Sequence, residues 1–366
     1  MQPDAPNEIK STEGMVDYDD NSLAQRQLAT LRAPLVARLA SSVDPKGPEL
    51  RIVDYGCGPG TTAVEAVRPA IAAWQQRFPG TAIAVCHADQ VGNDWNALFR
   101  LATGPEGYGG AGRNVRIEAA VGSFYEPLAL PGSVDLATCF FASHWLSRGV
   151  RLPAAGTVWF ADLTGDSRTA LAALARADWV RFLQCRALEL RPDGRLLVST
   201  LGAVPDDSEV NGAAVSGRGI YRALQTVANG MSDDGLIDRD VLDHFLFSLW
   251  FMTAAEAREP LEAEAALGEC FEIEDIHVEP APDHPSDLFA HAIDDRRRYA
   301  ELYAGYTRAF ADSTLRTQLL EPSLGDDGAV EQLAATFYDR LKRLYETTGN
   351  RYACEVWHLT VVLRRR

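Results

Sequence analysis

The first candidate ligand-binding residues in this sequence are three glycines that follow a short apolar run. In IVDYGCGPGTTA (52–63), Gly56, Gly58 and Gly60 come after β-branched residues, and the stretch 61–78 has the pattern of a helix. Glycine permits positive φ angles and lets a ligand approach the main chain. Nucleotide-like ligands bind at such strand-to-helix turns in open α/β sheets. The turn is therefore predicted to bind a ligand of this kind, the alternative being an ordinary glycine-rich turn.

Two classes of nucleotide-like ligand compete for this turn. The dinucleotide fingerprint is G-x-G-x-x-G, but Thr61 takes the place of its third glycine. Asp54 before the glycines and the order G-x-G-x-G instead resemble the first motif of S-adenosylmethionine-dependent methyltransferases. The sequence therefore favours S-adenosylmethionine as the cofactor over a nicotinamide dinucleotide.

The bulk composition is that of a soluble globular protein, and it excludes some partners. Of 366 residues, 46% are hydrophobic and 23% are charged, and the formal net charge is -16. Nucleic-acid binding depends on lysine and arginine side chains that neutralise phosphates, so we expect no nucleic-acid partner. The most apolar stretch, FLFSLWFM (245–252), is too short to span a bilayer, so we expect no membrane partner.

Cysteine usage and the first residues indicate a reducing compartment. The six cysteines form no CxxC pair, so we interpret them as reduced thiols without a zinc site. The polar residues 1–15 contain no signal-peptide core. We therefore expect a cytoplasmic protein.

The order of the predicted elements indicates an α/β fold. A helix at 21–40 precedes strands that alternate with helices, which implies a parallel sheet with crossover helices. After residue 204 the alternation stops, and two helical blocks imply a cap over the carboxyl edge of the sheet. The predicted strands are 51–55, 81–89, 115–126, 133–142, 191–202, 271–280 and 357–365, and the later helical stretches are 61–78, 168–190, 205–265 and 284–347.

Seven segments in this order resemble the SABATH family of plant-type carboxyl and N-methyltransferases, which act on salicylate, benzoate, jasmonate and xanthines. The combination of NSxxQ, GNDxN, GSFY and HWLS carries the resemblance, and the alanine- and arginine-rich composition suggests a bacterial member. The segments are YDDNSLAQRQ (18–27), IVDYGCGPGTTA (52–63), HADQVGNDWNALF (87–99), VGSFYEPL (121–128), CFFASHWLS (139–147), FLQCRALELRPDGRLLVSTLG (182–202) and GLIDRDVLDHF (235–245).

The resemblance implies a class I methyltransferase fold, in which a Rossmann-like α/β core binds S-adenosylmethionine beneath a helical cap that covers the acceptor pocket. Family members are often dimers, so a homodimer is expected. The implied parts are a core at 21–204 completed by strands at 268–280 and 350–366, a cap at 205–267 and 281–349, and an N-terminal segment at 1–20 that folds over the active site.

On the cofactor side, one acidic residue can be argued from its position. Asp89 ends the second predicted strand, where an acid accepts hydrogen bonds from the ribose hydroxyls in related folds. The resemblance implies that Gln90 flanks the adenosine, that Ser123 hydrogen-bonds the adenine and that the Phe124 ring stacks on the adenine.

The resemblance places further residues around the methionine portion of the cofactor. At the glycine turn they are Asp54, Gly56, Cys57 and Gly58. Those that fold over from the N-terminus are Tyr18 and Ser22, with Lys10 near the cofactor carboxylate. Those that line the gap between cofactor and acceptor are Cys139, Phe140 and Phe141.

On the acceptor side, the family pattern indicates Gln25, His144 and Trp145, with Phe141 at the gap. Trp250 would add a cap aromatic to the pocket wall or would instead belong to the core of the cap. His144 could donate to a carboxylate, accept a proton from a phenol or ring nitrogen, or be a packed histidine. The aromatic residues favour a flat or apolar acceptor over a sugar or a peptide.

These residue types suit the methylation of a carboxylate without a catalytic base. A carboxylic acid is already ionised at pH 7, and neutral amide and indole donors can orient it. A strong cationic clamp would stabilise the charged ground state more than the transition state, in which charge disappears. We therefore expect catalysis by alignment in a carboxyl O-methyltransferase of a small aromatic or apolar acid, with no catalytic residue required.

The sequence is also consistent with two other functions. An N- or O-methyltransferase of a heteroaromatic or phenolic compound would use His144 as a base. The other alternative is a cofactor-binding protein without transferase activity.

Some family members bind a metal through asparagines in the segments that match 152–158 and 242–247. Neither segment contains asparagine here, so no metal is expected. The stretch CFFASHW (139–145) has bulkier residues at its start than the family's S-S-x-S-x-x-W, which leaves the acceptor open.

Overall fold

The computed structural model describes residues 23–105, 107–109, 114–204, 214–283, 285–324 and 329–366. Its centre is a seven-stranded sheet with the strand order β3-β2-β1-β4-β5-β7-β6. β1 to β5 pair in parallel, and β7 runs antiparallel between β5 and β6. The strands are β1 Glu49–Tyr55, β2 Ala82–Asp89, β3 Val115–Val121, β4 Val134–Phe140, β5 Leu190–Leu201, β6 Phe271–Pro280 and β7 Trp357–Arg365. The α/β sheet predicted from the sequence is confirmed.

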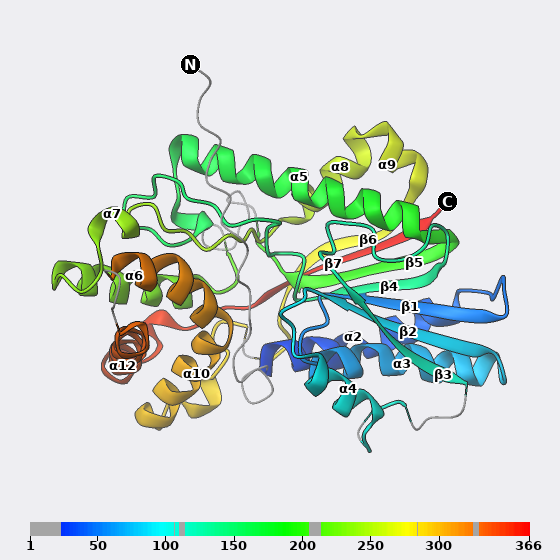
Figure 1. Cartoon of the computed structure of the whole chain (residues 1–366), viewed down its shortest axis with the longest axis horizontal. Coiled ribbons are helices and arrows are strands. Elements are labelled where there is room, and N and C mark those ends of the chain that lie inside the picture. The colour runs from blue at the N-terminus through cyan, green and yellow to red at the C-terminus, as the bar shows by residue number, and fades with distance from the viewer. Residues whose placement is uncertain (1–22, 106, 110–113, 205–213, 284, 325–328) are drawn as a thin grey trace.

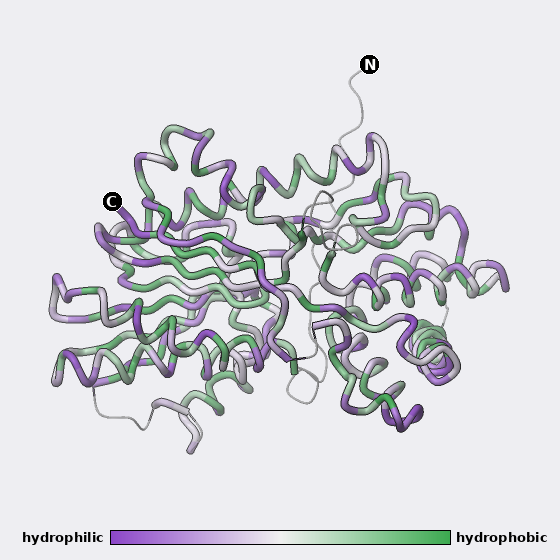
Figure 2. The backbone as a smooth tube through the Cα atoms, turned by 180° about the vertical axis from the view of Figure 1, so that it is seen from behind, coloured by the Kyte–Doolittle hydropathy of each residue, from purple (hydrophilic) through white to green (hydrophobic). Residues whose placement is uncertain are grey.

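The central strands are hydrophobic on both faces because helices cover both faces of the sheet. Every residue of β4 is buried, and β1 is buried from Ile52 onward, as expected for parallel strands inside an α/β protein. No residue of the edge strand β3 is buried. Figure 2 shows the hydrophobic residues running along the strands.

Helices pack on the two faces of the sheet in separate groups (Figure 1). On one face α2 packs against α3, and the indole of Trp74 in α3 donates to the Ala40 carbonyl in α2 over 2.8 Å. On the other face lies the long helix α5. The helices of the core are α2 Leu23–Ser41, α3 Thr61–Arg77, α4 Trp95–Thr103 and α5 Gly165–Glu189, and the short helix before α5 is η1 Phe160–Asp162.

The remaining helices divide between two places. α10 and α12 pack together and α12 contacts α6, which forms a helical group beside the sheet (Figure 1). In this group Tyr303 stacks on Tyr345 with ring centroids 4.5 Å apart. Its elements are α6 Arg218–Asp233, α7 Arg239–Leu242, η2 Ala290–Ala292, α10 Arg296–Leu315, η3 Arg316–Leu320, α11 Glu321–Ser323, α12 Val330–Thr348 and η4 Gly349–Tyr352.

Two helices that fall within the predicted cap range 205–267 lie on the core instead. α8 Ala254–Ala263 and α9 Ala265–Cys270 both contact α5 and β6 (Figure 1). The sequence indicated helices here but not which surface they would cover, because their apolar residues suit either partner. The helical group beside the sheet therefore begins with α6 and α7 and continues from η2.

The turn after β1 approaches the segment after β4 so closely that only glycine fits. Gly56 has a φ angle of +74°, and its N–H donates to the Ala88 carbonyl over 2.8 Å. A Cβ atom added at Gly56 would lie 2.2 Å from the Cβ atom of Ala142. Gly58 also has a positive φ angle, +59°. The glycines predicted to leave the backbone bare are thus required by the fold as well.

Replacing Gly56 by alanine is expected to destabilise the protein by more than about 2 kcal/mol, because the clash with Ala142 adds to a positive-φ strain of about 1–2 kcal/mol. Gly132→Ala is the control, since Gly132 has a φ angle of +63° and no atom lies within 4 Å of its added Cβ. Denaturant unfolding of both variants measures the difference. Equal losses, with no recovery in Gly56→Ala/Ala142→Gly, would contradict the steric argument.

Candidate active site

Two cavities open side by side where the parallel strands end. The glycine-turn cavity has about 950 Å³ of open space and is lined by residues that include Gly56, Gly58 and Asp89. The aromatic cavity has about 500 Å³ and lies against Gln25. Phe141, Trp145 and Phe310 line both cavities. The carboxyl edge of a parallel sheet is where α/β proteins bind their ligands.

Asp89 stands at the end of β2 on the wall of the glycine-turn cavity. One of its carboxylate oxygens accepts from the Gly58 N–H over 2.6 Å, and the other accepts from the Gln90 N–H over 2.7 Å. Burial raises the pKa of Asp89, and these two N–H groups oppose that rise. Gln90 also lines the cavity. The structure thus brings the predicted acid next to the bare turn.

The Phe124 ring forms another part of the same cavity wall, together with Phe140. It lies 3.6 Å from the position that a Cβ of Gly56 would take. Ser123, its neighbour, does not line the cavity, and its hydroxyl oxygen accepts from the Tyr125 N–H over 3.3 Å. Of the predicted adenine pair, the structure places the ring at the cavity and the hydroxyl beside it.

Three other predicted cofactor residues lie behind the cavity wall. The Asp54 carboxylate is buried in the sheet, where it accepts from the Thr138 hydroxyl over 2.8 Å and lies 3.5 Å from Nδ1 of His87. Burial raises the pKa of the Cys57 and Cys139 thiols, so both stay protonated. Asp54 can therefore support the turn from below, while the glycines form the surface.

Three predicted residues fall outside the described residues, namely Lys10, Tyr18 and Ser22. Gln25, in the same motif as Ser22, lies on α2 and is buried at 6% exposure. Its side-chain oxygen has no hydrogen-bond partner among the described residues. A buried amide with an unsatisfied polar atom at a cavity wall is suited to a ligand group, because leaving it unpaired is costly.

His144 follows β4 and is buried beside two aromatic rings. Its Nδ1 lies 2.7 Å from the Thr200 hydroxyl, and its ring centroid lies 5.3 Å from those of Trp145 and Phe251. Burial lowers the pKa of His144 to about 3. The imidazole is therefore neutral at physiological pH and can serve as a hydrogen-bonding group more readily than as a base.

The described residues that line the aromatic cavity are mostly apolar, and none of them is cationic. Among the described residues that line it, the polar side chains are those of Gln25, His144, Trp145 and two tyrosines, and none is lysine or arginine. The two tyrosines are Tyr221 and Tyr306, and the remaining lining residues are Phe141, Leu201, Gly217, Ile220, Phe310, Cys354 and Val356. The described wall of this cavity is therefore uncharged, and its role in binding an acceptor stays a prediction.

Trp250 does not line the aromatic cavity. Its indole N–H donates to Glu256 over 3.2 Å, its ring lies 4.7 Å from that of Phe160, and the Arg168 guanidinium lies 5.3 Å from its centroid. The cap rings at the cavity are instead Tyr221 of α6 with Tyr306 and Phe310 of α10, which sequence reasoning missed. Tyr306 and Phe310 are four residues apart, so they share one face of α10, and that spacing was the available signal.

The described part of the chain contains no group of three or more histidine, cysteine, aspartate or glutamate residues that could hold a metal ion. In the same residues, no helix has both the length and the apolar character needed to cross a membrane. All six cysteines are free thiols.

The residues at the glycine-turn cavity fit S-adenosylmethionine. Gly58 presents bare backbone there, since no atom lies within 4 Å of a Cβ built on it. Asp89 offers a carboxylate for hydroxyl groups, and Phe124 offers a ring face for a base. These three groups match what a nucleoside with a charged tail requires.

The comparisons with known proteins agree with this geometry. A family model described as SAM dependent carboxyl methyltransferase matches residues 8–366. Salicylate carboxymethyltransferase of Clarkia breweri is 26% identical over 65% of this chain and 67% of that protein. Gibberellic acid methyltransferase 1 of Arabidopsis thaliana is 25% identical over 82% and 84%. A 3,7-dimethylxanthine N-methyltransferase of Camellia sinensis var. assamica is 24% identical over 73% and 77%.

A solved structure of loganic acid methyltransferase with SAH superposes on this chain with a TM-score of 0.76. The superposition covers 97% of this chain and 98% of the other at 19% identity, and it confirms the class I methyltransferase fold. The family model covers nearly the whole sequence, including the glycine turn and both cavity walls. The chain is therefore a member of the family of S-adenosylmethionine-dependent carboxyl methyltransferases, the SABATH family that its motifs resemble.

Proposed function

We propose that the protein methylates the carboxylate of a small aromatic or apolar acid and releases its methyl ester. The observation that carries the proposal is the aromatic cavity, which adjoins the glycine-turn cavity through Phe141 and Trp145 and has no lysine or arginine among its described lining residues. S-adenosylmethionine supplies a methyl group on a positively charged sulfur. Membership of the carboxyl methyltransferase family supports the reaction class.

In this proposal Gln25 and Trp145 orient the acceptor carboxylate. Both line the aromatic cavity from separate elements. The Gln25 amide NH2 group can donate to the carboxylate, whereas its unpaired oxygen can only accept. The indole N–H of Trp145 is a neutral donor at the same cavity wall. Neutral donors hold the carboxylate without neutralising it, so its oxygen keeps the charge that makes it a nucleophile.

The cavity walls have two further tasks, alignment and exclusion of water. Phe141, Tyr221 and Phe310 form apolar walls around the acceptor side, which favour a flat ring or an apolar chain. His144 is held by Thr200 at 2.7 Å and stays neutral, so it orients the acceptor and does not remove a proton. Holding reactants in line can contribute several kcal/mol to the rate.

On the cofactor side we assign Asp89 to the ribose, Gln90 to the adenosine and Phe124 to the adenine face. Ser123 stays a predicted adenine partner. Gly56 and Gly58 provide the surface beneath the methionine portion, with Cys57 and Asp54 behind it, and Phe140 faces the gap. The roles of Tyr18, Ser22 and Cys139 in cofactor binding and of Trp250 in acceptor binding stay predictions from the resemblance.

A second candidate reaction is the N- or O-methylation of a heteroaromatic or phenolic compound. The relation to an N-methyltransferase of xanthines favours it, whereas burial, which lowers the pKa of His144 to about 3, makes that residue a poor base.

A cytoplasmic location, consistent with six free thiols, and a homodimer complete the proposal.

Incubation with S-adenosylmethionine labelled in its methyl group and a panel of aromatic and apolar acids tests the proposed reaction. We expect label in a volatile, base-labile product, because methyl esters hydrolyse in base. Base-stable label would indicate N- or phenol methylation instead. Calorimetric binding of S-adenosylhomocysteine without transfer to any acceptor would favour a cofactor-binding protein that lacks transferase activity.

Gln25→Ala and Trp145→Ala are each expected to raise the acceptor KM at least about tenfold, about 1.4 kcal/mol, because each removes a neutral donor from the carboxylate. Cofactor affinity should change less than about twofold in Gln25→Ala, since Gln25 does not line the glycine-turn cavity. Gln27→Ala on the exposed face of α2 is the matched control. Wild-type turnover of either variant at low acceptor concentration would contradict the assignment.

The value of kcat/KM is expected to change less than about twofold between pH 6 and pH 8. Over that range the acceptor is ionised, with a carboxyl pKa of about 4, and His144 is neutral because burial lowers its pKa to about 3. A rise in kcat/KM through pH 6.5 that is lost in His144→Gln would instead identify a base.

The lowered pKa of His144 also predicts a loss of stability in acid. The pKa of His144 is lower in the folded protein than in the unfolded chain, so its protonation favours unfolding. Its contribution is complete above the unfolded value of about 6.5 and is lost as the pH falls from there toward 3. Thermal unfolding of wild type and His144→Gln from pH 7 to pH 4 should show a smaller decrease in the variant.

A further inference from the structure

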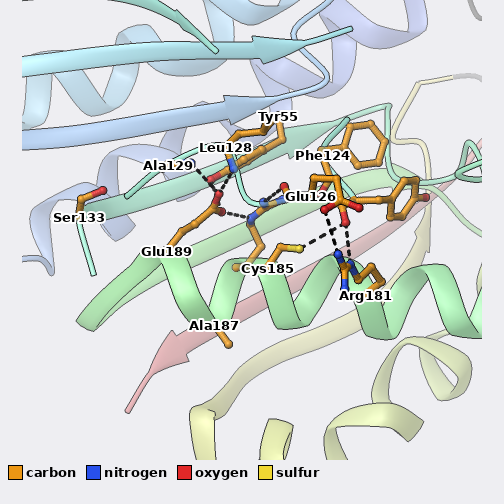
Figure 3. A network of polar contacts seen from close by, with 12 residues as sticks. Tyr55, Phe124, Glu126, Leu128, Ala129, Ser133, Arg181, Cys185, Ala187 and Glu189 are labelled. Carbon is orange, nitrogen blue, oxygen red and sulfur yellow. Dashed lines mark hydrogen bonds and ion pairs between the residues drawn. The ribbon is translucent and has the colours of Figure 1, made fainter. Parts of the chain in front are cut away.

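A buried ion pair lies at the end of α5, outside both cavities. Arg186 and Glu189 are each 0% exposed, and the Arg186 Nε donates to a Glu189 oxygen over 2.6 Å. Figure 3 shows Glu189 between the helix and the loop that follows β3. Burying two charges is costly unless further hydrogen bonds satisfy them, so the other partners of the pair indicate what it holds.

The Glu189 carboxylate joins two segments that are distant in the sequence. One oxygen accepts from the Tyr55 hydroxyl over 2.7 Å. The other accepts from the backbone N–H groups of Leu128 and Ala129 over 2.5 and 2.8 Å (Figure 3). The carboxylate therefore connects the end of β1 to the loop after β3.

Arg186 holds the same two segments. Its guanidinium donates to the Phe124 carbonyl over 3.0 Å and to the Glu126 carbonyl over 3.3 Å. It also lies 3.6 Å from the centroid of the Tyr55 ring, a distance at which a cation is attracted to an aromatic face. The pair thus fixes backbone positions in the loop and one side chain of β1.

Both segments carry a wall of the glycine-turn cavity. Tyr55 directly precedes Gly56, and Phe124 presents its ring to the cavity from the loop. We propose that Arg186 and Glu189 are positioning residues that hold the glycine turn and the Phe124 loop at the spacing required for cofactor binding. This inference rests on the proposed role of Phe124 and the glycine turn in binding S-adenosylmethionine.

The physical effect is preorganisation of the site. Without the pair, the loop would have to be ordered when the cofactor binds, and that cost would reduce affinity. The pair touches neither the aromatic cavity nor Gln25. Its removal therefore weakens cofactor binding more than acceptor binding, which a purely structural pair would not do selectively.

The test is the double variant Arg186→Met/Glu189→Gln, which removes both charges and so leaves no unpaired buried charge. The glutamine oxygen can still accept from Leu128 and Ala129. The matched control is Arg191→Met/Asp135→Asn, because Arg191 and Asp135 form another buried pair, at the start of β5 and β4 and away from both cavities. Tyr55→Phe removes one hydroxyl and is measured in parallel.

Calorimetry with S-adenosylhomocysteine should give a Kd at least about tenfold above wild type for the double variant, about 1.4 kcal/mol, and at least about threefold for Tyr55→Phe. The acceptor KM at saturating S-adenosylmethionine should change less than about twofold. The control should keep its Kd within about twofold even where its unfolding temperature falls.

Three outcomes overturn the inference and one concerns a different claim. The pair does not position the site if the folded double variant has a wild-type Kd, or if the Kd of the control rises equally. If the double variant does not fold, an unchanged Kd in Tyr55→Phe would show the same. Failure of the wild-type protein itself to bind S-adenosylhomocysteine would instead refute the proposed function.

Discussion

The structure depends on one steric constraint, the contact between the turn after β1 and the segment after β4. Gly56 and Ala142 approach so closely that a Cβ on the glycine would lie 2.2 Å from its neighbour. Because of this approach, the turn and the residues 141–145 form adjoining walls, and the two cavities share Phe141 and Trp145. A donor bound at one wall and an acceptor bound at the other are then next to each other without any further rearrangement.

Charge follows the same division between the two cavities. The glycine-turn cavity contains the carboxylate of Asp89, whereas the aromatic cavity has neutral polar groups at its wall. A cationic donor and an anionic acceptor attract each other strongly in surroundings of low dielectric constant. In the proposed reaction, neutral hydrogen-bond donors such as Gln25 would be sufficient to orient the acceptor, because the methyl donor itself would provide the opposite charge.

The supporting polar residues lie behind the cavity walls, where solvent does not weaken them. Asp54 is hydrogen-bonded to Thr138 within the sheet, and Arg186 and Glu189 pair beneath the loop after β3. Buried, fully bonded groups restrict the backbone to one arrangement. The glycine backbone and the aromatic rings form the cavity surface together with Asp89 and Gln90, and the buried polar groups lie in the layer below.

The sequence alone determined the parallel sheet, the glycine turn, the acid at the end of β2 and the family, because each is a local pattern of residue types along the chain. It also identified Gln25, His144 and Trp145, which the fold brings to one cavity. Tertiary structure decided that Trp250 packs on Phe160 and that Tyr221, Tyr306 and Phe310 line the acceptor wall. It likewise placed α8 and α9 on the core and Asp54 behind the turn. The direction in which a helical side chain points depends on how its helix packs against distant segments, and residue spacing along the chain does not contain that information.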